Sequence, residues 1–316
     1  MSDPLIIAIP SKGRLKEQVE EWLADCGLEL AVSGGARGYM ADIKGLPGAQ
    51  VRLLSASDIA DALGAGEAHL GVTGEDLLRE RGDLESRVLL LRALGFGRAD
   101  LVVAAPKSWL DVDTMADLEE VAHDYLARTG RRMRVATKYL TQTRGFFARH
   151  GVVDYRITES GGATEGAPAA GAAELIVDIT TTGATLAANG LKILSDGLIL
   201  KSQAQLTASL RAAWSADQLG AAERLLRAVE GRARAKASAT LIWPATSGSA
   251  EAKVVDTLVA AGATRRPHGL MIAAGRATEA AQAITAAGLG PVTVSKPDFV
   301  FEADCPSFAA LQQRVI

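Results

Sequence analysis

The sequence predicts an α/β protein that has two lobes followed by a smaller domain. Short apolar runs alternate with amphipathic helical segments along the first two thirds of the chain. A glycine-rich connection at Leu94–Arg98 interrupts this alternation, and a strand pattern returns at Leu191–Leu200. A chain that crosses to a second lobe and then returns would place a cleft between the lobes.

The strands of this part are expected where apolar runs are bounded by turn residues. They are Leu5–Ile9, Val51–Ser55, His69–Thr73, Leu101–Ala104, Arg134–Thr137, Tyr155–Glu159 and Leu175–Ile179. Because helices connect most of them, we expect mainly parallel sheets, with ligands at the carboxyl ends of the strands.

The helices are expected where apolar residues recur at helical spacing, as Leu15, Val19, Trp22 and Leu23 do. The ranges are Gly13–Asp25, Ile59–Leu63, Glu75–Glu80, Asp111–Glu120 and Leu140–Arg149. Ser57 and Asp58 are expected to cap the second helix, and Asp113 or Thr114 the fourth.

The last third predicts a long helix and then a separate small domain. The helix spans Ala208 to Arg234, and the domain starts near Lys236. Its order is strand, helix, strand, helix, strand: Ala239–Trp243, Ala250–Ala260, His268–Ala273, Thr278–Ala286 and Val292–Phe301. We therefore expect a first lobe of residues 1–95 with 191–230, a second lobe of residues 96–190, and a C-terminal α/β domain of residues 236–316, for which a ferredoxin-like arrangement is one candidate.

Composition narrows the function classes. The 316 residues include 34 Lys and Arg against 37 Asp and Glu, so no basic excess points to nucleic acid. No apolar stretch approaches the roughly 20 residues that span a bilayer, and the short apolar N-terminus is typical of a strand rather than a signal peptide. The two cysteines, Cys26 and Cys305, are too far apart for a metal pair. We expect a cytoplasmic protein.

The most informative segment joins a buried strand to a helix. Asp178 ends the strand, and Thr180-Thr-Thr-Gly-Ala-Thr185 follows. Backbone N–H groups and hydroxyls at such a turn can hold an anion, and Asp178 can accept hydrogen bonds from ribose hydroxyls or face a metal ion. The Gly-Lys-Thr/Ser ending of a Walker A loop is absent. An ordinary capped turn, with Gly183 at a tight bend, is the alternative.

Three other strand-to-helix turns are weaker signals. Pro10–Leu15 offers Lys12 and Arg14, which suit a polyphosphate, although solvated surface charge is the alternative. Gly71–Asp76 carries Glu75 and Asp76, which can cap a helix or contact a base or a metal. Gly161–Glu165 could let a ligand approach the backbone closely or be a flexible connection.

Side chains for nucleophilic catalysis are not evident. The four histidines have no metal-ligand spacing, and no GxSxG motif occurs.

Together these segments resemble the ATP phosphoribosyltransferases, which catalyse the first step of histidine biosynthesis. The matching pieces occur in the family's order over roughly the first 205 residues. They are IAIPSKGRL (7–15), HLGVTGEDL (69–77), RVATKY (134–139), ESGGATEGAP (159–168) and DITTTGATLAANGL (178–191).

The resemblance implies a fold and a reaction. The fold is two-lobed, like a periplasmic binding protein, with the cleft between the lobes. The reaction joins ATP and phosphoribosyl pyrophosphate into phosphoribosyl-ATP and pyrophosphate, with Mg²⁺. Relatives form dimers or hexamers, so a homo-oligomer is also implied.

The same resemblance assigns roles to residues. Thr181, Thr182, Gly183, Ala184, Thr185 and Leu186 would hold the 5-phosphate of the ribosyl donor, and Asp178 would bind its ribose hydroxyls. Lys12 and Arg14 would be the catalytic cations, with Gly13 beside them near ATP or pyrophosphate. Glu75, Asp76, Gly162 and Glu165 would line the cleft, and the residues that contact Mg²⁺ stay undetermined.

The sequence departs from the family in two places. Many relatives carry an Arg shortly before the pair Asp58-Ile59, where this chain has Leu54-Ser-Ala-Ser57. Long-form members carry a C-terminal βαββαβ domain that binds histidine as a feedback inhibitor, whereas the tail here predicts βαβαβ. Short-form members lack that domain and depend on a partner related to histidyl-tRNA synthetase.

Two other classes share the expected fold. A solute-binding module would have no chemistry, but several phosphate-type loops in one cleft argue against a simple amino-acid binder. A transcription-factor effector domain is disfavoured because no basic recognition helix precedes it. Pyrophosphate release in the presence of both substrates would separate an enzyme from a binder.

Overall fold

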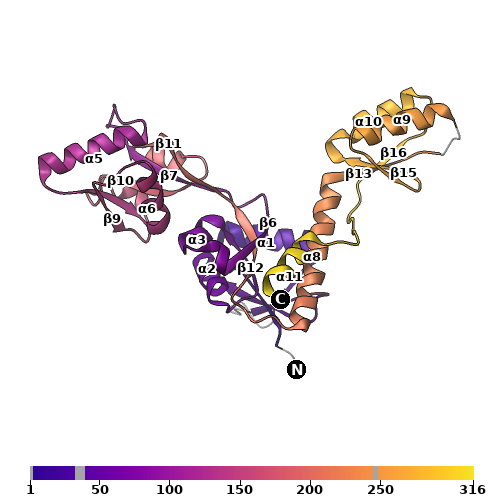
Figure 1. The fold of residues 1–316 in the computed structure, drawn as a ribbon, viewed down its shortest axis with the longest axis horizontal. Coiled ribbons are helices and arrows are strands. Elements are labelled where there is room, and N and C mark those ends of the chain that lie inside the picture. The colour runs from indigo at the N-terminus through magenta and orange to yellow at the C-terminus, as the bar shows by residue number, and fades with distance from the viewer. Residues whose placement is uncertain (1–2, 33–39, 245–247) are drawn as a thin grey trace.

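The computed structural model describes residues 3–32, 40–244 and 248–316, arranged as three bodies around three sheets. Figure 1 shows the first lobe at the centre, with the second lobe on one arm and the C-terminal body on the other. The two-lobed α/β fold with a small C-terminal body is therefore confirmed. No helix in the described ranges is long and apolar enough to cross a membrane.

The first lobe contains a seven-stranded sheet of order β2-β3-β4-β1-β5-β12-β6. Its strands are β1 (Leu5–Pro10), β2 (Leu30–Val32), β3 (Met40–Ile43), β4 (Ala49–Leu54), β5 (Leu70–Gly74), β6 (Val88–Ala93) and β12 (Ala204–Ser209). The central strand β1 is buried on both faces. Leu5, Ile7 and Ile9 belong to one core, and Ile6 and Ala8 to another.

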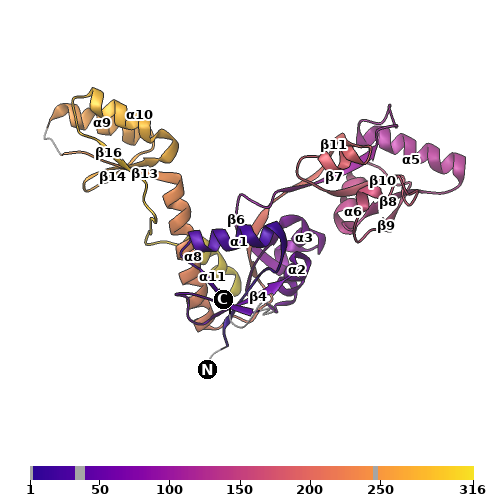
Figure 2. The same ribbon diagram turned by 180° about the vertical axis from the view of Figure 1, so that it is seen from behind.

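Helices cover both faces of this sheet. The core that holds Leu5 also receives α1 (Gly13–Asp25) and α8 (Ala216–Ala237), which Figure 2 shows on the same side of the lobe. The opposite core receives α2 (Ala56–Ala65) and α3 (Glu75–Glu80), and the short α4 (Leu84–Arg87) packs at its edge.

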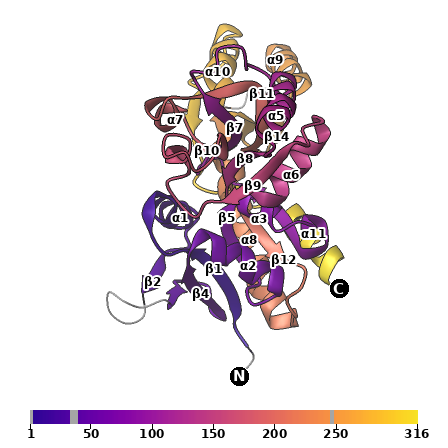
Figure 3. The same ribbon diagram turned by 90° about the vertical axis from the view of Figure 1, so that its left-hand side faces the viewer.

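The second lobe contains a five-stranded sheet of order β11-β7-β10-β8-β9. Its strands are β7 (Ala99–Pro106), β8 (Met133–Thr137), β9 (Tyr155–Glu159), β10 (Leu175–Thr180) and β11 (Leu191–Ser202). The helices are α5 (Met115–Thr129), α6 (Leu140–Arg149) and α7 (Ala184–Ala188), with a 3-10 turn η1 at Thr164–Gly166. Figure 3 shows this lobe above the first lobe.

The prediction of mainly parallel sheets was wrong, because both sheets are mixed. β1 pairs in parallel with β4 and β5, but β12 is antiparallel to β5 and to β6. In the second lobe β7 runs antiparallel to β10 and β11. β12 enters the first sheet straight from the other lobe, without a crossover helix, so nothing requires it to run parallel.

Two predicted helix starts were also wrong. The helix expected from Ala208 begins at Ala216, because Ser215 and Gln218 form a capping box, and residues 208–209 belong to β12. α2 begins at Ala56 with Ser55 as its cap, not with Ser57 and Asp58. α5 is capped by Thr114, one of the two caps proposed.

The C-terminal body contains a four-stranded antiparallel sheet of order β14-β15-β13-β16. Its elements are β13 (Ser238–Ile242), α9 (Ser249–Ala260), β14 (Thr264–Arg266), β15 (Gly269–Ala273), η2 (Ala274–Arg276), α10 (Ala277–Ala286) and β16 (Thr293–Ser295). The helix–strand order is therefore βαββαβ, and the predicted βαβαβ order was wrong. β14 is exposed at all three residues, so it lacks the apolar signal that marks a strand.

The chain then returns to the first lobe. The strand expected over Val292–Phe301 is confined to β16, and the last helix, α11 (Pro306–Val315), packs on α8 and β6. Its Leu311 and the preceding Cys305 lie in the core of the first lobe. The segment predicted as residues 236–316 thus ends in a helix packed on another body, and the domain division stays a prediction.

A buried hydrogen-bond network joins the two lobes. The carboxylate of Asp76, on α3, accepts hydrogen bonds from Tyr139 at the start of α6 (2.7 Å) and from Ser202 at the end of β11 (2.7 Å). Asp76 is buried, with only 5% of its surface exposed. Glu80 accepts the backbone N–H groups of Thr141 and Gln142, so α3 caps the helix of the other lobe.

Replacing Tyr139 by Phe should lower the unfolding free energy by about 1–3 kcal/mol, because the buried Asp76 carboxylate loses a donor. Urea unfolding followed by circular dichroism measures the change. Tyr155→Phe is the matched control, since the Tyr155 hydroxyl makes no hydrogen bond within the described ranges. An equal effect of the two substitutions would contradict a stabilising role of the network.

Candidate functional site

The turn between β10 and α7 is held by its own threonines. The Oγ1 atom of Thr180 accepts the backbone N–H of Gly183 (2.8 Å), and that of Thr182 accepts the N–H of Ala184 (3.3 Å). Gly183 has φ +74°, a left-handed conformation that glycine adopts without strain. The turn is thus closed by local hydrogen bonds with Gly183 at the bend, and it also lines a pocket, so phosphate binding at this turn stays a prediction.

That pocket has a volume of about 320 Å³ and lies at the carboxyl end of β10. It is lined by Ala99, Glu165, Asp178, Ile179, Thr180, Thr181, Thr182, Thr185 and Leu186. The N–H groups in the first turn of a helix have no intrahelical acceptor, so those of α7 that the turn threonines leave unbonded are available to an anion. Hydroxyls and free N–H groups together suit a phosphate.

Asp178 is a half-buried carboxylate at the rim of the threonine turn. Burial raises its pKa, and the charge of Glu165 adds to that effect, while the Ile179 N–H, Lys138 and Thr164 act in the opposite direction. The Oδ1 atom of Asp178 accepts the Ile179 N–H at 2.8 Å. A hydrogen-bond donor or a cation in the pocket would reduce the electrostatic repulsion between Asp178 and Glu165.

Lys138 is a residue that the sequence analysis did not select. It follows β8, whose residues pair in parallel with β10, and it acts electrostatically on Asp178 from the neighbouring strand end. Its ammonium group also lies 5.1 Å from the centre of the Tyr139 ring. The signal was present, since Lys138 stands in the RVATKY segment at the carboxyl end of a predicted strand.

A second hollow adjoins the first at the crossing between the lobes. Its volume is about 410 Å³, and it shares Ala99, Thr180 and Thr181 with the threonine pocket. The exposed cations Arg98 and Lys201 line it. The Oγ1 atom of Thr181 donates to the Arg98 carbonyl at 3.2 Å, so the crossing segment supports the turn. The crossing between the lobes brings these two cations to the pocket from positions about 100 residues apart in the sequence.

The turn that carries Lys12, Gly13 and Arg14 lies at the start of α1, and all three residues are exposed. No contact places their side chains in the threonine pocket. The turn nevertheless adjoins the crossing, because a Cβ atom at Gly97 would lie 2.9 Å from Leu15 of α1. The cationic turn and the threonine turn thus border the same connecting segment.

The four remaining candidate residues of the predicted cleft lie in different surroundings. Glu165 lines the threonine pocket, and Gly162 lies in an exposed turn whose carbonyl accepts the Ser160 hydroxyl. Glu75 is engaged by Arg79 (2.7 Å) and Gln205 (2.8 Å). Asp76 is buried in the network between the lobes, so neither of these two candidates presents a free carboxylate.

Comparison with known proteins settles the family. The family model described as "HisG: ATP phosphoribosyltransferase" matches residues 55–231. A protein named ATP phosphoribosyltransferase, from Caulobacter vibrioides strain NA1000, is 69% identical over 96% of this chain and 95% of its own length. The chain belongs to the ATP phosphoribosyltransferase family.

Other members match over comparable lengths. An ATP phosphoribosyltransferase from Rhodopseudomonas palustris strain HaA2 is 49% identical and covers 98% of both chains. Among solved structures, a chain of the "ATP phosphoribosyl transferase (HisG:HisZ) complex" from Thermotoga maritima is 26% identical, with a TM-score of 0.54. That match covers 98% of the Thermotoga chain but 72% of this one, so this chain has a region that the Thermotoga chain lacks.

The electrostatics of the threonine pocket predict a pH-dependent gain in stability from Asp178→Asn. Because the folded-state pKa of Asp178 is above 3.8, the ionised carboxylate destabilises the fold above that pH, and the penalty disappears when the pH falls below 3.8. The variant should therefore melt at a higher temperature at pH 7, and the gain should shrink towards pH 4.

Melting curves between pH 4 and pH 8 measure this effect. The exposed Asp111→Asn removes the same charge and serves as the control. A gain that does not change with pH, or one that grows as the pH falls, would contradict the burial argument.

Proposed function

We propose that this protein transfers the phosphoribosyl group of phosphoribosyl pyrophosphate to N1 of the adenine of ATP. The products are phosphoribosyl-ATP and pyrophosphate, and the reaction is the first step of histidine biosynthesis. The observation that carries the proposal is the pocket at the end of β10, where Asp178 and four threonines line one hollow in a chain of this family.

The ribosyl donor is proposed to bind at the threonine turn. Thr181, Thr182 and Thr185 supply hydroxyls for the 5-phosphate, and Gly183 and Ala184 shape the turn through their bonds to Thr180 and Thr182. The backbone N–H groups of Thr185 and Leu186, which the turn threonines leave unbonded, complete the proposed phosphate site. Asp178 lies on the strand side of the same pocket, where an ionised carboxylate accepts hydrogen bonds from the two ribose hydroxyls.

The carboxylates of this pocket fit a Mg²⁺ ion. Mg²⁺ prefers oxygen ligands and is usually bound by one or two carboxylates together with substrate phosphates. Asp178 and Glu165 line one pocket and repel one another electrostatically, and a cation would remove that repulsion. When bound with the donor, Mg²⁺ supplies charge neutralisation for the pyrophosphate.

The cations of the first lobe are proposed to stabilise the leaving group. Adenine N1 forms a bond to C1 of the ribose, the bond between C1 and the pyrophosphate oxygen breaks, and pyrophosphate takes the electron pair. Lys12 and Arg14 are exposed and have no partner within the described ranges, so both are available to the phosphates. Alignment of the reactants and electrostatic stabilisation explain why the reaction needs no nucleophilic side chain.

The C-terminal body is proposed to be the regulatory domain. Its βαββαβ order is the pattern of the histidine-binding domain in long-form members. Inhibition by histidine, a homo-oligomeric state and a cytoplasmic location are predictions that follow from this assignment. An enzyme of this form would be active without a partner subunit.

An assay with purified protein, ATP, phosphoribosyl pyrophosphate and Mg²⁺ tests the proposal. The ultraviolet absorbance of phosphoribosyl-ATP reports the product, and inorganic pyrophosphatase draws the reaction forward. Product formation is expected without any partner protein and should fall when histidine is added. A protein that binds both substrates but releases no pyrophosphate would be a binding module.

Arg14→Ala should lower kcat/KM by a factor of about 10 to 100, because a charge-assisted contact to a phosphate contributes about 1.5–3 kcal/mol. Steady-state rates with both substrates varied measure this change. Lys16→Ala is the matched control on the same helix, since Lys16 faces Glu20 at 3.5 Å. Equal losses in the two variants would remove Arg14 from the mechanism.

Asp178→Asn should raise the KM for phosphoribosyl pyrophosphate at least tenfold while the KM for ATP changes little. The amide keeps the bond to the Ile179 N–H but is a weaker acceptor for ribose hydroxyls. The KM values of both substrates, measured side by side, decide the point. An effect on the KM for ATP alone would place Asp178 elsewhere in the reaction.

A further inference from the structure

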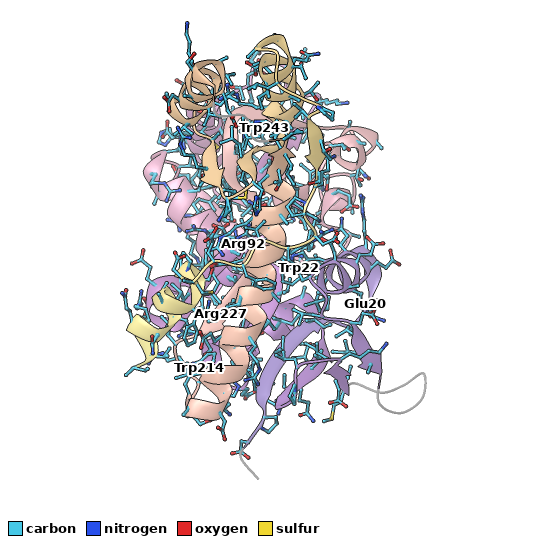
Figure 4. All side chains as sticks on the ribbon, turned by 90° about the vertical axis from the view of Figure 1, so that its right-hand side faces the viewer. Glu20, Trp22, Arg92, Trp214, Arg227 and Trp243 are labelled. Carbon is cyan, nitrogen blue, oxygen red and sulfur yellow. The ribbon has the colours of Figure 1, made fainter. Side chains whose placement is uncertain are left out.

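A separate hollow lies in the first lobe, where three of its segments meet. Its volume is about 240 Å³, and it is bordered by the end of α1, the end of β6 and the C-terminal part of α8. Figure 4 shows Trp22 and Arg92 beside α8. None of its lining residues lines the threonine pocket or the hollow at the crossing.

Two hydrogen-bond donors of this hollow lack acceptors. Arg92 is half-buried, yet its guanidinium makes no hydrogen bond or ion pair within the described part of the chain. The indole N–H of Trp22, also half-buried, has no acceptor there either. A partly desolvated guanidinium without a partner is costly, and an anion that enters the hollow would satisfy it.

The other charges of the hollow leave it positive. Asp25 forms ion pairs with Arg232 and Lys236, both at 2.6 Å. The lining residues carry a net charge of about +2, counting Arg92, Arg232 and Lys236 against Asp25. The exposed Asp298 faces Arg232 at 3.8 Å from outside the lining, and including it leaves a net charge of about +1. Hydrogen bonds from Arg232 and Lys236 lower the pKa of Asp25 to about 2, and burial raises the pKa of Cys26 to about 11. The positive charge therefore persists across the physiological pH range.

The rest of the lining is apolar. Leu94, Val229 and Ala233 surround the charged groups, together with the ring of Trp22. The volume is below the range of about 300–1,000 Å³ that holds drug-sized ligands, so the occupant must be compact. An anionic group at one end and a small flat apolar body at the other match this lining.

We propose that the hollow between α1, β6 and α8 binds a small organic carboxylate. The carboxylate pairs with the planar guanidinium of Arg92 and accepts the indole N–H of Trp22, and the apolar body lies against Leu94 and Val229. This site is independent of the transferase reaction. Its position nevertheless joins the helix that carries Lys12 and Arg14, the crossing to the second lobe, and the helix that leads to the C-terminal body.

Nuclear magnetic resonance with ¹⁵N-labelled tryptophan tests the site on the full chain. The chain has four tryptophans, so four indole N–H signals are expected, and Trp22→Phe assigns the one from Trp22. Benzoate should shift that signal selectively, with a Kd in the millimolar range. Benzamide, which has the same shape and no charge, should leave it in place.

Arg92→Gln should weaken benzoate binding at least tenfold, and the three other indole signals report whether the variant keeps its fold. Trp22→Phe keeps an aromatic ring but loses the indole N–H. Ligand-observed spectra should therefore show a loss of benzoate affinity that is smaller than the loss in Arg92→Gln. The proposal fails if benzoate does not move the Trp22 signal, or if Arg92→Gln binds benzoate as tightly as the natural chain. Tighter binding of inorganic phosphate than of benzoate would overturn the carboxylate assignment in favour of a phosphate site.

Discussion

The contact between the two lobes depends on one buried carboxylate. Asp76 stands on the first lobe, accepts a hydroxyl from the second lobe at Tyr139, and accepts another from the returning chain at Ser202. A buried charge with fewer donors would be costly, so the three elements are held together as a unit. The returning segment is also held next to this hydrogen-bond network, because the Gln203 carbonyl accepts the N–H of Glu75, the residue before Asp76.

The two lobes that this hydrogen-bond network connects present different chemical groups. The second lobe presents hydroxyls, N–H groups and a carboxylate at the end of β10, whereas the first lobe presents cations at the start of α1. In the reaction proposed above, the second lobe would hold the phosphate of the ribosyl donor, and the cations of the first lobe would stabilise the leaving pyrophosphate. Both sets border the crossing segment, since Leu15 of α1 lies beside Gly97 and Thr181 donates to the Arg98 carbonyl.

Local sequence was sufficient wherever local forces decide the structure. The ranges of α1, α3 and α6 follow from helical periodicity, and the threonine turn follows from the residues between β10 and α7. Sequence was insufficient where long-range contacts decide. β12 lacks a clear apolar pattern, because its buried residues include Gln205, Thr207 and Ser209. An alanine-rich helix follows it closely in the sequence, so helical periodicity assigned the end of β12 to that helix. The partners of Asp76 are 63 and 126 residues away, and the cations Arg98 and Lys201 approach the pocket only through the crossing.

The return of α11 to the first lobe changes what the C-terminal body is topologically. It is attached at two ends, through α8 and through residues 296–305, and both attachments end in the same core. Glu230 of α8 reinforces the second attachment by accepting the N–H of Ser307 at 2.8 Å. A body on a single helix can swivel about the helix axis, whereas two anchors oppose such torsion. Topologically, the C-terminal body is therefore an insertion within the first lobe. A displacement of this body would be transmitted to the core of the first lobe through both connections.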